Sequence, residues 1–153
     1  MAIKGILLVG GRGTRLLPLT ETTPKPMLKV AGVPFTLHQL LKAKAAGISE
    51  IVLATSFMAE VFEPYFGDGS KFGLKIHYAV EKEALGTGGA IKNARNILDL
   101  QPGDSVVIFN GDVLSGHDLA GQISFHHREK SAVTLYLTEV SDARAFGCVP
   151  IDE

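Results

Sequence analysis

Three short apolar runs are spaced along the 153-residue chain, at residues 3–9, 51–55 and 106–109. A near-continuous apolar run of this length is typical of a strand that is covered on both faces of a sheet. Helical patterns lie between and after these runs, at residues 34–47, 88–100 and 119–130. This alternation predicts an α/β fold, with a Rossmann-like mixed, mostly parallel sheet and helices on both of its faces.

The remaining segments are expected to extend this fold. Residues 74–80 and 132–140 alternate apolar and polar side chains, which predicts strands with one covered face. A short helix is expected over residues 58–66, where Pro64 would bend or truncate it. No repeat or linker divides residues 1–153, so they are expected to form one domain. Since the chain stops on what reads as a strand entering a turn, we expect this domain to be incomplete at its C-terminus.

Composition limits the classes of partner. The formal net charge is -1, so no basic surface is expected for nucleic acid or for an acidic membrane. No apolar stretch approaches the roughly 20 residues that a membrane-spanning helix needs. Cys148 is the only cysteine, which excludes an internal disulfide, and we expect it to be buried. These features, with no signal-peptide pattern, predict a cytoplasmic protein; assembly into a homo-oligomer is left open.

A glycine-rich loop follows the first apolar run. It reads Gly10-Gly11-Arg12-Gly13-Thr14-Arg15-Leu16-Leu17-Pro18-Leu19-Thr20, and Pro24-Lys25-Pro26 comes shortly after. The P-loop pattern would require Gly-Lys-Ser/Thr at its end, and the dinucleotide fingerprint would require a glycine at the position of Leu16. The prolines exclude a regular helix, so we expect a long ordered loop over residues 10–27, which in a compact domain is usually functional.

The residue types of this loop suit a phosphate ligand. Gly10, Gly11 and Gly13 allow the backbone to approach phosphate oxygens closely. Arg15 offers a planar fork of donors, and Lys25 offers a compact charge on a backbone stiffened by prolines. The alternative is a surface turn with solvated cations, which the length of the combined pattern disfavours.

The pattern G-G-x-G-T-R-L-x-P-L-T followed by P-K-P-M resembles the signature of the sugar-phosphate nucleotidyltransferases. The resemblance covers essentially all of residues 1–153, because later motifs follow in order, and it implies a nucleotidyltransferase domain that is truncated. It also implies a reaction in which a nucleoside triphosphate and a sugar 1-phosphate give a nucleotide-sugar and pyrophosphate. By the same resemblance, Gly10, Gly11, Gly13, Thr14 and Arg15 bind nucleotide, and Arg15 and Lys25 are catalytic.

A second loop, residues 81–90, resembles the family's base-binding loop, with Glu81, Gly86 and Thr87 as the implied nucleotide-binding residues. A carboxylate only accepts hydrogen bonds, and guanine presents two adjacent donors on its Watson–Crick edge. Glu81 therefore favours GTP, and the local sequence most resembles the guanylyltransferases that act on mannose 1-phosphate. The alternatives are a solvated acidic cluster of Glu81 with Glu83, or a sister enzyme that uses UTP, dTTP or ATP with glucose 1-phosphate.

Asn110-Gly111-Asp112 follows the third apolar run, so Asp112 should lie at the carboxyl end of a strand, where open α/β sheets bind ligands. The resemblance implies that Gly111 binds nucleotide, that Asp112 binds Mg²⁺ and that Phe146 and Gly147 line the sugar pocket. Mg²⁺ typically takes one or two carboxylates together with substrate phosphates. The family uses a second metal-binding aspartate farther downstream, which would lie beyond residue 153.

The implied reaction requires no general base, because a phosphate monoester with a second pKa of about 6 is largely a dianion near neutrality. The task is to position two polyanions and to neutralise their charge, with Arg15 and Mg²⁺ on the leaving phosphates and Lys25 on the α-phosphate. An alternative of another class is a non-catalytic regulatory subunit built on the same domain. Such relatives usually lose the arginine or the lysine of the first loop, and this chain has both.

Overall fold

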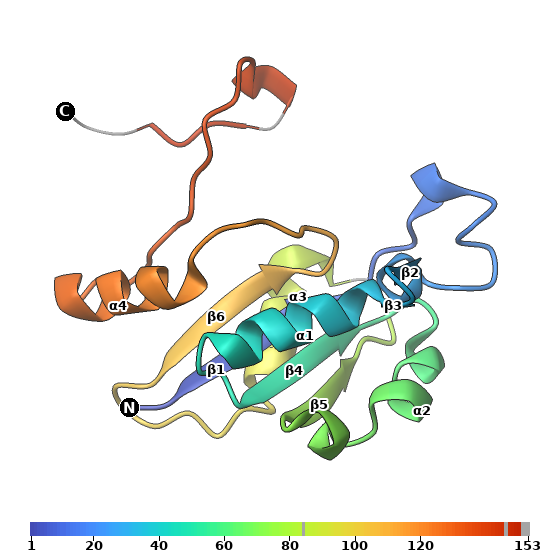
Figure 1. Ribbon diagram of the computed structural model, residues 1–153, viewed down its shortest axis with the longest axis horizontal. Helices are drawn as coiled ribbons and strands as arrows, with labels where there is room; N and C mark the ends of the chain where they lie inside the picture. The colour runs from blue at the N-terminus through green and yellow to red at the C-terminus, as the bar shows by residue number, and fades with distance from the viewer. Residues whose placement is uncertain (84, 146, 151–153) are drawn as a thin grey trace. The chain divides into compact units, whose positions relative to one another are not determined.

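The structure is a computed structural model that describes residues 1–83, 85–145 and 147–150. It divides into two compact units, Met1–His117 and Asp118–Glu153. Figure 1 shows the chain coloured by residue number.

The first unit contains a four-stranded parallel sheet in the order β5-β4-β1-β6. Its strands are β1 (Ile3–Leu8), β4 (Glu50–Thr55), β5 (Lys75–Val80) and β6 (Ser105–Asn110). The chain builds outwards from β1 through β4 to β5 and then returns to the other side of β1 with β6. In open α/β sheets, ligands bind outside the carboxyl ends of the strands at the point where this direction reverses. Here that point lies between the ends of β1 and β6, where Leu8 pairs with Asn110.

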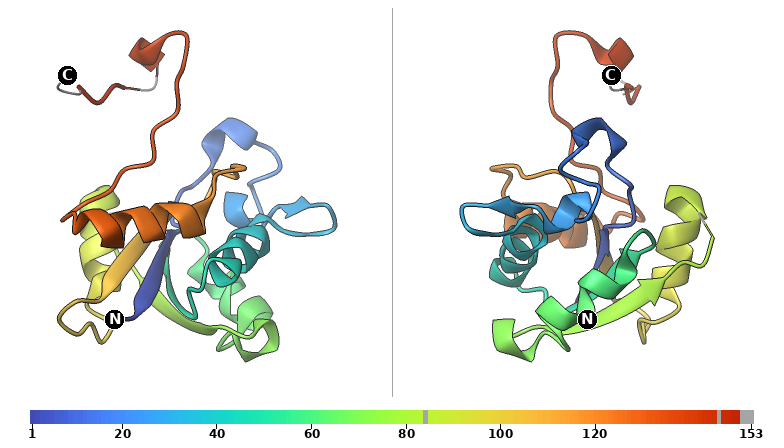
Figure 2. Two further views of the ribbon diagram at one scale, coloured as in Figure 1. Left: turned by 60° about the vertical axis from the view of Figure 1, so that its left-hand side comes forward. Right: turned by 90° about the vertical axis from the view of Figure 1, so that its right-hand side faces the viewer.

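Two helices cover opposite faces of this sheet. Helix α1 (Phe35–Ala45) and helix α3 (Gly86–Arg95) lie on either side of the strands in Figures 1 and 2. On the α3 side, one buried cluster joins the sheet to the helix and the segment after it; its members are Ile6, Val52, Ala54, Ala79, Ala94 and Leu98. The α/β fold with a parallel sheet and helices on both faces is therefore confirmed.

Smaller elements connect these parts. Strands β2 (Lys29–Val30) and β3 (Val33–Pro34) form a two-residue hairpin before α1, a feature that the sequence patterns do not predict. Residues 10–27 contain two short 3₁₀ turns, Thr14–Leu16 and Lys25–Met27, and no α-helix, as expected. The helix expected over residues 58–66 is split into a 3₁₀ turn, Ala59–Val61, and α2 (Glu63–Phe66).

Two expectations for the first unit are wrong in detail. The helix expected over residues 88–100 is shifted towards the N-terminus, since α3 begins at Gly86 and ends at Arg95. The strand at residues 106–109 was expected to be buried on both faces, yet Ile108 is 48% exposed. The reason is that α3 packs over β4, β1 and β5, which leaves the outer strand β6 less covered.

The second unit contains helix α4 (Leu119–Glu129), as expected for residues 119–130. Asp118 caps this helix, because its side chain accepts a hydrogen bond of 3.0 Å from the backbone N–H of Gly121. Residues 132–140 form no strand, which contradicts the alternating pattern. An alternating segment becomes a strand only when its backbone finds a partner, and the described residues of this unit contain no strand. Cys148, expected to be buried, is exposed in the same irregular region.

Among the described residues, none of the helices has the length and apolar character needed to span a membrane.

Candidate functional site

An ion pair joins the two loops that meet at the carboxyl ends of β1 and β6. The Nζ of Lys25 lies 2.8 Å from Oδ2 of Asp112, although the two residues are far apart in the sequence. Their side chains are 31% and 45% exposed, and a pair this exposed contributes at most about 1 kcal/mol to stability. The pair therefore places a cation and a carboxylate within reach of a ligand without being needed to hold the fold together.

Gly13 allows the loop to fold back against Lys25. Its φ of +64° lies in the left-handed region, where an L side chain is strained. A Cβ at this position would lie 2.9 Å from Cβ of Lys25 and 3.1 Å from Cγ2 of Thr20. The buried hydroxyl of Thr20 donates a 3.0 Å hydrogen bond to the Gly13 carbonyl and closes the loop. Glycine is required here by conformation and by space.

Gly10 and Gly11 serve different purposes. The Gly10 carbonyl accepts a 2.6 Å hydrogen bond from Oγ of Ser56, and a Cβ on Gly10 would lie 2.5 Å from that oxygen. Gly10 is therefore required by packing against the residue that follows β4. A Cβ on Gly11 would meet no atom within 4 Å, so the Gly11 backbone is the part of the loop that is open to a ligand. Sequence reasoning treated the three glycines alike and missed the contributions of Ser56 and Thr20.

Thr14 and Arg15 lie on the exposed 3₁₀ turn that follows Gly13. Within the described residues, the Arg15 guanidinium has no hydrogen-bond or ion-pair partner. The neighbouring Arg12 lies over the ring of Phe57, at 5.8 Å from its centroid. Arg15 is therefore an exposed arginine of this loop without a partner among the described residues, and its role towards an anion stays a prediction.

Asp112 lies in a tight turn at the end of β6. The backbone N–H of Val113 donates to the Asn110 carbonyl at 3.3 Å, and that of Gly111 donates to the Leu8 carbonyl at 2.9 Å. A Cβ on Gly111 would overlap the Leu8 carbonyl, so the turn can approach β1 this closely only with glycine. The turn thus presents the Asp112 carboxylate directly beside the end of β1.

Asp112 fits the part of a Mg²⁺ ligand. The described residues contain no group of three or more His, Cys, Asp or Glu side chains that could hold a metal by themselves. Mg²⁺ does not need such a group, because it binds through one or two carboxylates together with waters and substrate phosphates. A carboxylate has two acceptor oxygens, so Oδ2 of Asp112 can accept from Lys25 while Oδ1 binds a cation.

The second loop lies farther along the same edge of the sheet. The Glu81 N–H donates to the Thr55 carbonyl at 2.9 Å, and Oε2 of Glu81 accepts a 3.3 Å hydrogen bond from the N–H of Leu85. Gly86, with a φ of +68°, opens α3, and the exposed Thr87 follows it. Three inter-strand spacings separate the ends of β5 and β6, or about 14 Å. The structure therefore brings Lys25, Asp112 and the glycine loop together, but it leaves Glu81 across the sheet from them.

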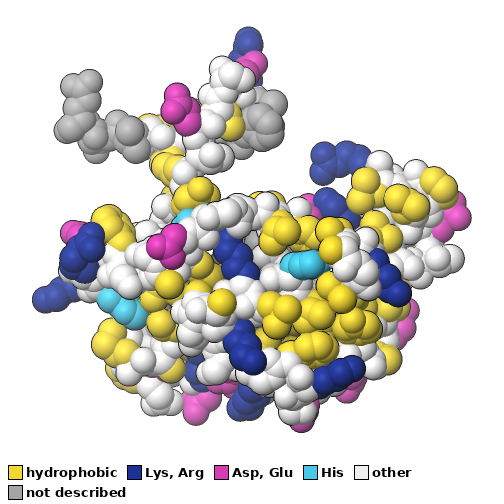
Figure 3. Space-filling view, in the orientation of Figure 1, with side chains coloured by type: hydrophobic (Ala, Val, Ile, Leu, Met, Phe, Trp, Pro, Cys, Tyr) yellow, Lys and Arg dark blue, Asp and Glu magenta, His cyan; other side chains and the backbone are white. Residues whose placement is uncertain are grey.

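A small cavity of about 130 Å³ adjoins the ion pair. Its lining is mostly apolar and consists of Leu16, Lys25, Leu28, Val30, Phe35, Gly111 and Asp112. Hydrophobic side chains also gather on the surface over α1 and the β2–β3 hairpin (Figure 3). The Lys25–Asp112 pair thus lies at the border between a polar loop and an apolar surface.

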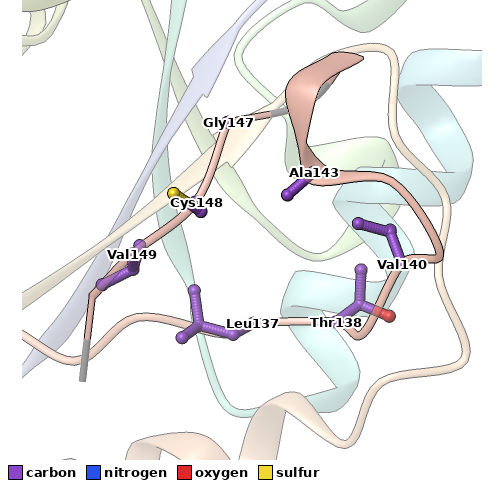
Figure 4. Close-up of a pocket in the computed structure, with 7 residues that line it drawn as sticks. All are labelled: Leu137, Thr138, Val140, Ala143, Gly147, Cys148 and Val149. Atoms are coloured by element: carbon purple, nitrogen blue, oxygen red, sulfur yellow. The ribbon is translucent and has the colours of Figure 1, made fainter. Parts of the chain in front are cut away.

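The residues expected at the sugar pocket lie in the second unit. Phe146 lies outside the described residues. Gly147 lines an open hollow of about 460 Å³ together with residues of the segment 137–149 (Figure 4). The other lining residues are Leu137, Thr138, Val140, Ala143, Cys148 and Val149. The sugar-binding role of Phe146 and Gly147 stays a prediction.

A second charged cluster lies at the opposite, amino-terminal end of the strands. Glu50 accepts from Lys4 at 2.9 Å, from His77 at 2.8 Å and from Lys75 at 3.0 Å. Nζ of the buried Lys4 also donates to the Asp99 carbonyl at 2.6 Å. The hydrogen bond from Lys4, supported by those from His77 and Lys75, outweighs burial and lowers the pKa of Glu50 from 4.5 to about 2. This cluster stabilises the sheet and is remote from the glycine-rich loop that follows β1.

Comparison with known proteins agrees with this geometry. The family model described as nucleotidyl transferase matches residues 4–153. A mannose-1-phosphate guanylyltransferase of Mycobacterium tuberculosis is 52% identical over 151 residues, which are 99% of this chain and 41% of that protein. A mannose-1-phosphate guanyltransferase of Gibberella zeae is 36% identical over 96% of this chain and 40% of its own length.

A solved structure, HddC from Yersinia pseudotuberculosis complexed with GMP-PN, superposes with a TM-score of 0.69 at 30% identity. The superposition covers 82% of this chain and 54% of the HddC chain. The chain thus spans about two fifths of the length of the curated relatives that it matches. Since the family match extends over nearly every residue, and the glycine loop, Lys25 and Asp112 meet at the switch point of the sheet, the chain belongs to the nucleotidyl transferase family.

Proposed function

We propose that this chain forms the nucleotide-binding part of a GTP-dependent guanylyltransferase, which uses mannose 1-phosphate and releases GDP-mannose and pyrophosphate. The observation that carries the proposal is the Lys25–Asp112 pair, 2.8 Å apart, beside a glycine loop whose Gly11 backbone is open. The names of the relatives at 52% and 36% identity support the choice of nucleotide and sugar. A cytoplasmic location, expected from the single cysteine, is part of the same proposal.

The chemical step is an in-line displacement at the α-phosphorus. A phosphate oxygen of mannose 1-phosphate forms a bond to the α-phosphorus, the bond to the bridging α–β oxygen breaks, and pyrophosphate leaves with that electron pair. The attacking monoester is already a dianion near neutrality, so no side chain has to remove a proton. The protein has to hold two polyanions in line and to neutralise their charge.

Lys25 and Arg15 are the residues that supply this neutralisation. The Lys25 ammonium has three N–H donors, and one of them already points to Asp112, which leaves two for oxygens of the α-phosphate and the attacking phosphate. Arg15, exposed on its 3₁₀ turn, offers a planar fork to the β- and γ-phosphates. Mg²⁺, held by Asp112 and phosphate oxygens, would add positive charge on the leaving group.

Glu81 is the residue proposed to select guanine. Its carboxylate can accept both the ring N–H and the amino group of guanine, whereas adenine would oppose it with a lone pair. The hydrogen bond from Leu85 to Glu81 is 3.3 Å long, so it is a weak competitor for the carboxylate. A nucleotide that contacts both Glu81 and Asp112 would have to lie across the ends of β4 and β1.

Pyrophosphate release by the full-length protein tests the proposal. GTP, UTP, dTTP and ATP are each supplied with Mg²⁺ and either mannose 1-phosphate or glucose 1-phosphate. The highest kcat/KM is expected for GTP with mannose 1-phosphate. A different best pair would contradict the assigned substrates. Nucleotide binding without pyrophosphate release from any pair would contradict the enzyme and support a regulatory subunit.

A further inference from the structure

Three polar side chains follow one another at every third position of α1: Thr36, Gln39 and Lys42. Residues at this spacing lie on one broad face of a helix. Thr36 is fully buried, Gln39 is 3% exposed and Lys42 is partly buried. We call these three residues the α1 polar stripe. Buried polar groups destabilise a fold unless they are hydrogen-bonded, so the hydrogen-bond partners of the stripe indicate its role.

Thr36 holds the segment that carries Lys25. Its Oγ1 donates a buried hydrogen bond of 2.8 Å to the Pro26 carbonyl, in the 3₁₀ turn Lys25–Met27. Pro26 and Met27 of this turn are also buried, so apolar packing and the Thr36 hydrogen bond together hold the turn.

Gln39 holds the turn that carries Asp112. Its Nε2 donates to the Val113 carbonyl and also lies 3.5 Å from the Asn110 carbonyl. Both neighbours are acceptors, so the amino end of the amide, and not its oxygen, has to face them. Gln39 therefore contacts the first and the last residue of the turn in which Asp112 lies.

Lys42 extends the same contact by one more turn of the helix. Its Nζ donates to the Ser115 carbonyl at 2.6 Å and lies 3.2 Å from Ser115 Oγ. A single helix thus holds the backbone of the Lys25 segment and, separately, the backbone on either side of Asp112.

We propose that the α1 polar stripe positions the two halves of the phosphate site, with Thr36 setting the place of Lys25 and Gln39 that of Asp112. The inference rests on the proposed function for its catalytic consequence, but its structural content is independent of it. Thr36 and Gln39 are positioning residues, because each is buried and contacts the backbone beside a charged residue. A helix packed on the sheet is rigid, so it fixes a separation that two loops could not fix by themselves.

Millisecond hydrogen exchange tests the positioning of the turn without any substrate. Gln39→Met keeps the volume and removes the donor, so exchange of the Gly111 and Val113 amides is expected to be at least about tenfold faster. The matched control is Leu40→Met, at the next position of the same helix and also buried, which should leave these two amides unchanged. Unchanged exchange in Gln39→Met, or equal acceleration in Leu40→Met, would overturn the role of Gln39.

Thr36→Val tests the other half of the stripe in the same way. It should accelerate exchange of the Met27 and Leu28 amides, which close the turn around Lys25, and leave the Asp112 turn unchanged. If exchange changed equally at both loops in Thr36→Val and in Gln39→Met, the stripe would stabilise the helix only, and the separate positioning of the two loops would be wrong.

Steady-state kinetics of the full-length protein test the catalytic consequence. Gln39→Met should raise the Mg²⁺ concentration for half-maximal rate by at least about fivefold with the KM for GTP little changed, because the carboxylate is less well held. Thr36→Val should lower kcat by about tenfold or more without changing the Mg²⁺ requirement. This consequence would be overturned if Thr36→Val changed the Mg²⁺ requirement and Gln39→Met changed only kcat, or if neither variant had an effect. If the wild-type protein releases no pyrophosphate, the proposed function fails, and the exchange experiments alone still decide whether the stripe positions the loops.

Discussion

Replacing Gly13 by alanine should lower the stability of the protein for two separate reasons, backbone strain and steric overlap. The φ of +64° costs an L residue about 1–2 kcal/mol, of which about 0.4–1 kcal/mol is regained because alanine restricts the unfolded chain. The new Cβ would lie 2.9 Å from Cβ of Lys25 and 3.1 Å from Cγ2 of Thr20, well inside the ordinary contact distance of roughly 3.5–4.0 Å.

Relief of this overlap requires movement of atoms close to the backbone, and overpacking of this kind costs about 1–3 kcal/mol. Together the two effects amount to about 1–4.5 kcal/mol, and the midpoint near 3 kcal/mol corresponds to a decrease in Tm of roughly 6–12 °C for a chain of this size. The movement also displaces Lys25. A misplacement of about 1 Å can lower the rate by about 100-fold, so kcat/KM should fall at least that far.

Thermal unfolding and pyrophosphate release, measured on the same samples, check both effects. Gly116→Ala is the matched control, because its Cβ would meet no atom within 4 Å and its φ is not in the left-handed region. Gly11→Ala separates the two effects, since it should leave Tm unchanged while the new methyl group blocks the approach of phosphate. An unchanged Tm and near-normal kcat/KM in Gly13→Ala would refute the reasoning about this loop.

Three further predictions concern charged side chains. Lys25→Ala should be nearly inactive while its Tm stays close to that of the wild type, because the Lys25–Asp112 pair contributes at most about 1 kcal/mol to stability. Lys71→Ala is the control for activity. Near-normal turnover of Lys25→Ala would remove the role assigned to Lys25. Glu81→Gln should reduce the preference for GTP over UTP by about tenfold, since the amide has one acceptor oxygen in place of two and its NH2 would oppose one of the two guanine donors. An unchanged ranking of kcat/KM for the four nucleotides would remove that argument. The pKa of Glu50 is lower in the folded protein than in the unfolded chain, so its stabilisation is present above pH 4.5 and is lost as the pH falls towards about 2. Glu50→Gln should therefore lower the free energy of unfolding, measured in urea at pH 7, by about 1–2 kcal/mol after solvent screening. In this variant the free energy of unfolding should also fall less steeply over that pH range. An unchanged slope of this free energy against pH would argue against the role of the Glu50 cluster.

The strands and helices that could be predicted were those with a strong local pattern. Residues 3–9 and 51–55 are near-continuous apolar runs, interrupted only by Lys4 and Thr55, because β1 and β4 are the two central strands. The run at 106–109 looks the same, but β6 lies at the outside of the sheet, and a sequence pattern does not contain the strand order. Residues 132–140 alternate correctly for a strand, yet the described residues of their own unit contain no strand to pair with, and a sequence pattern does not contain the pairing partner.

The sequence pointed to the charged residues that the structure brings together, and it missed the residues that support them. Lys25 and Asp112 were identifiable because a charge in a proline- or glycine-rich turn has a chemical signature. Gln39 has none, because a glutamine in the middle of a helix reads as a solvent-facing residue. Only the structure shows that Gln39 is buried and bonded to the Asp112 turn.

The sequence by itself determined the fold class, the glycine-rich loop that we propose binds an anion, and the side chains that carry charge, because each of these depends on residues close together in the chain. Only the tertiary structure decided that Lys25 and Asp112 meet, that Gly10 serves packing while Gly11 is open, and that α1 holds both loops. These features depend on which strands are neighbours and on how a helix packs across them. That arrangement is set by burial over the whole unit and not by any local pattern.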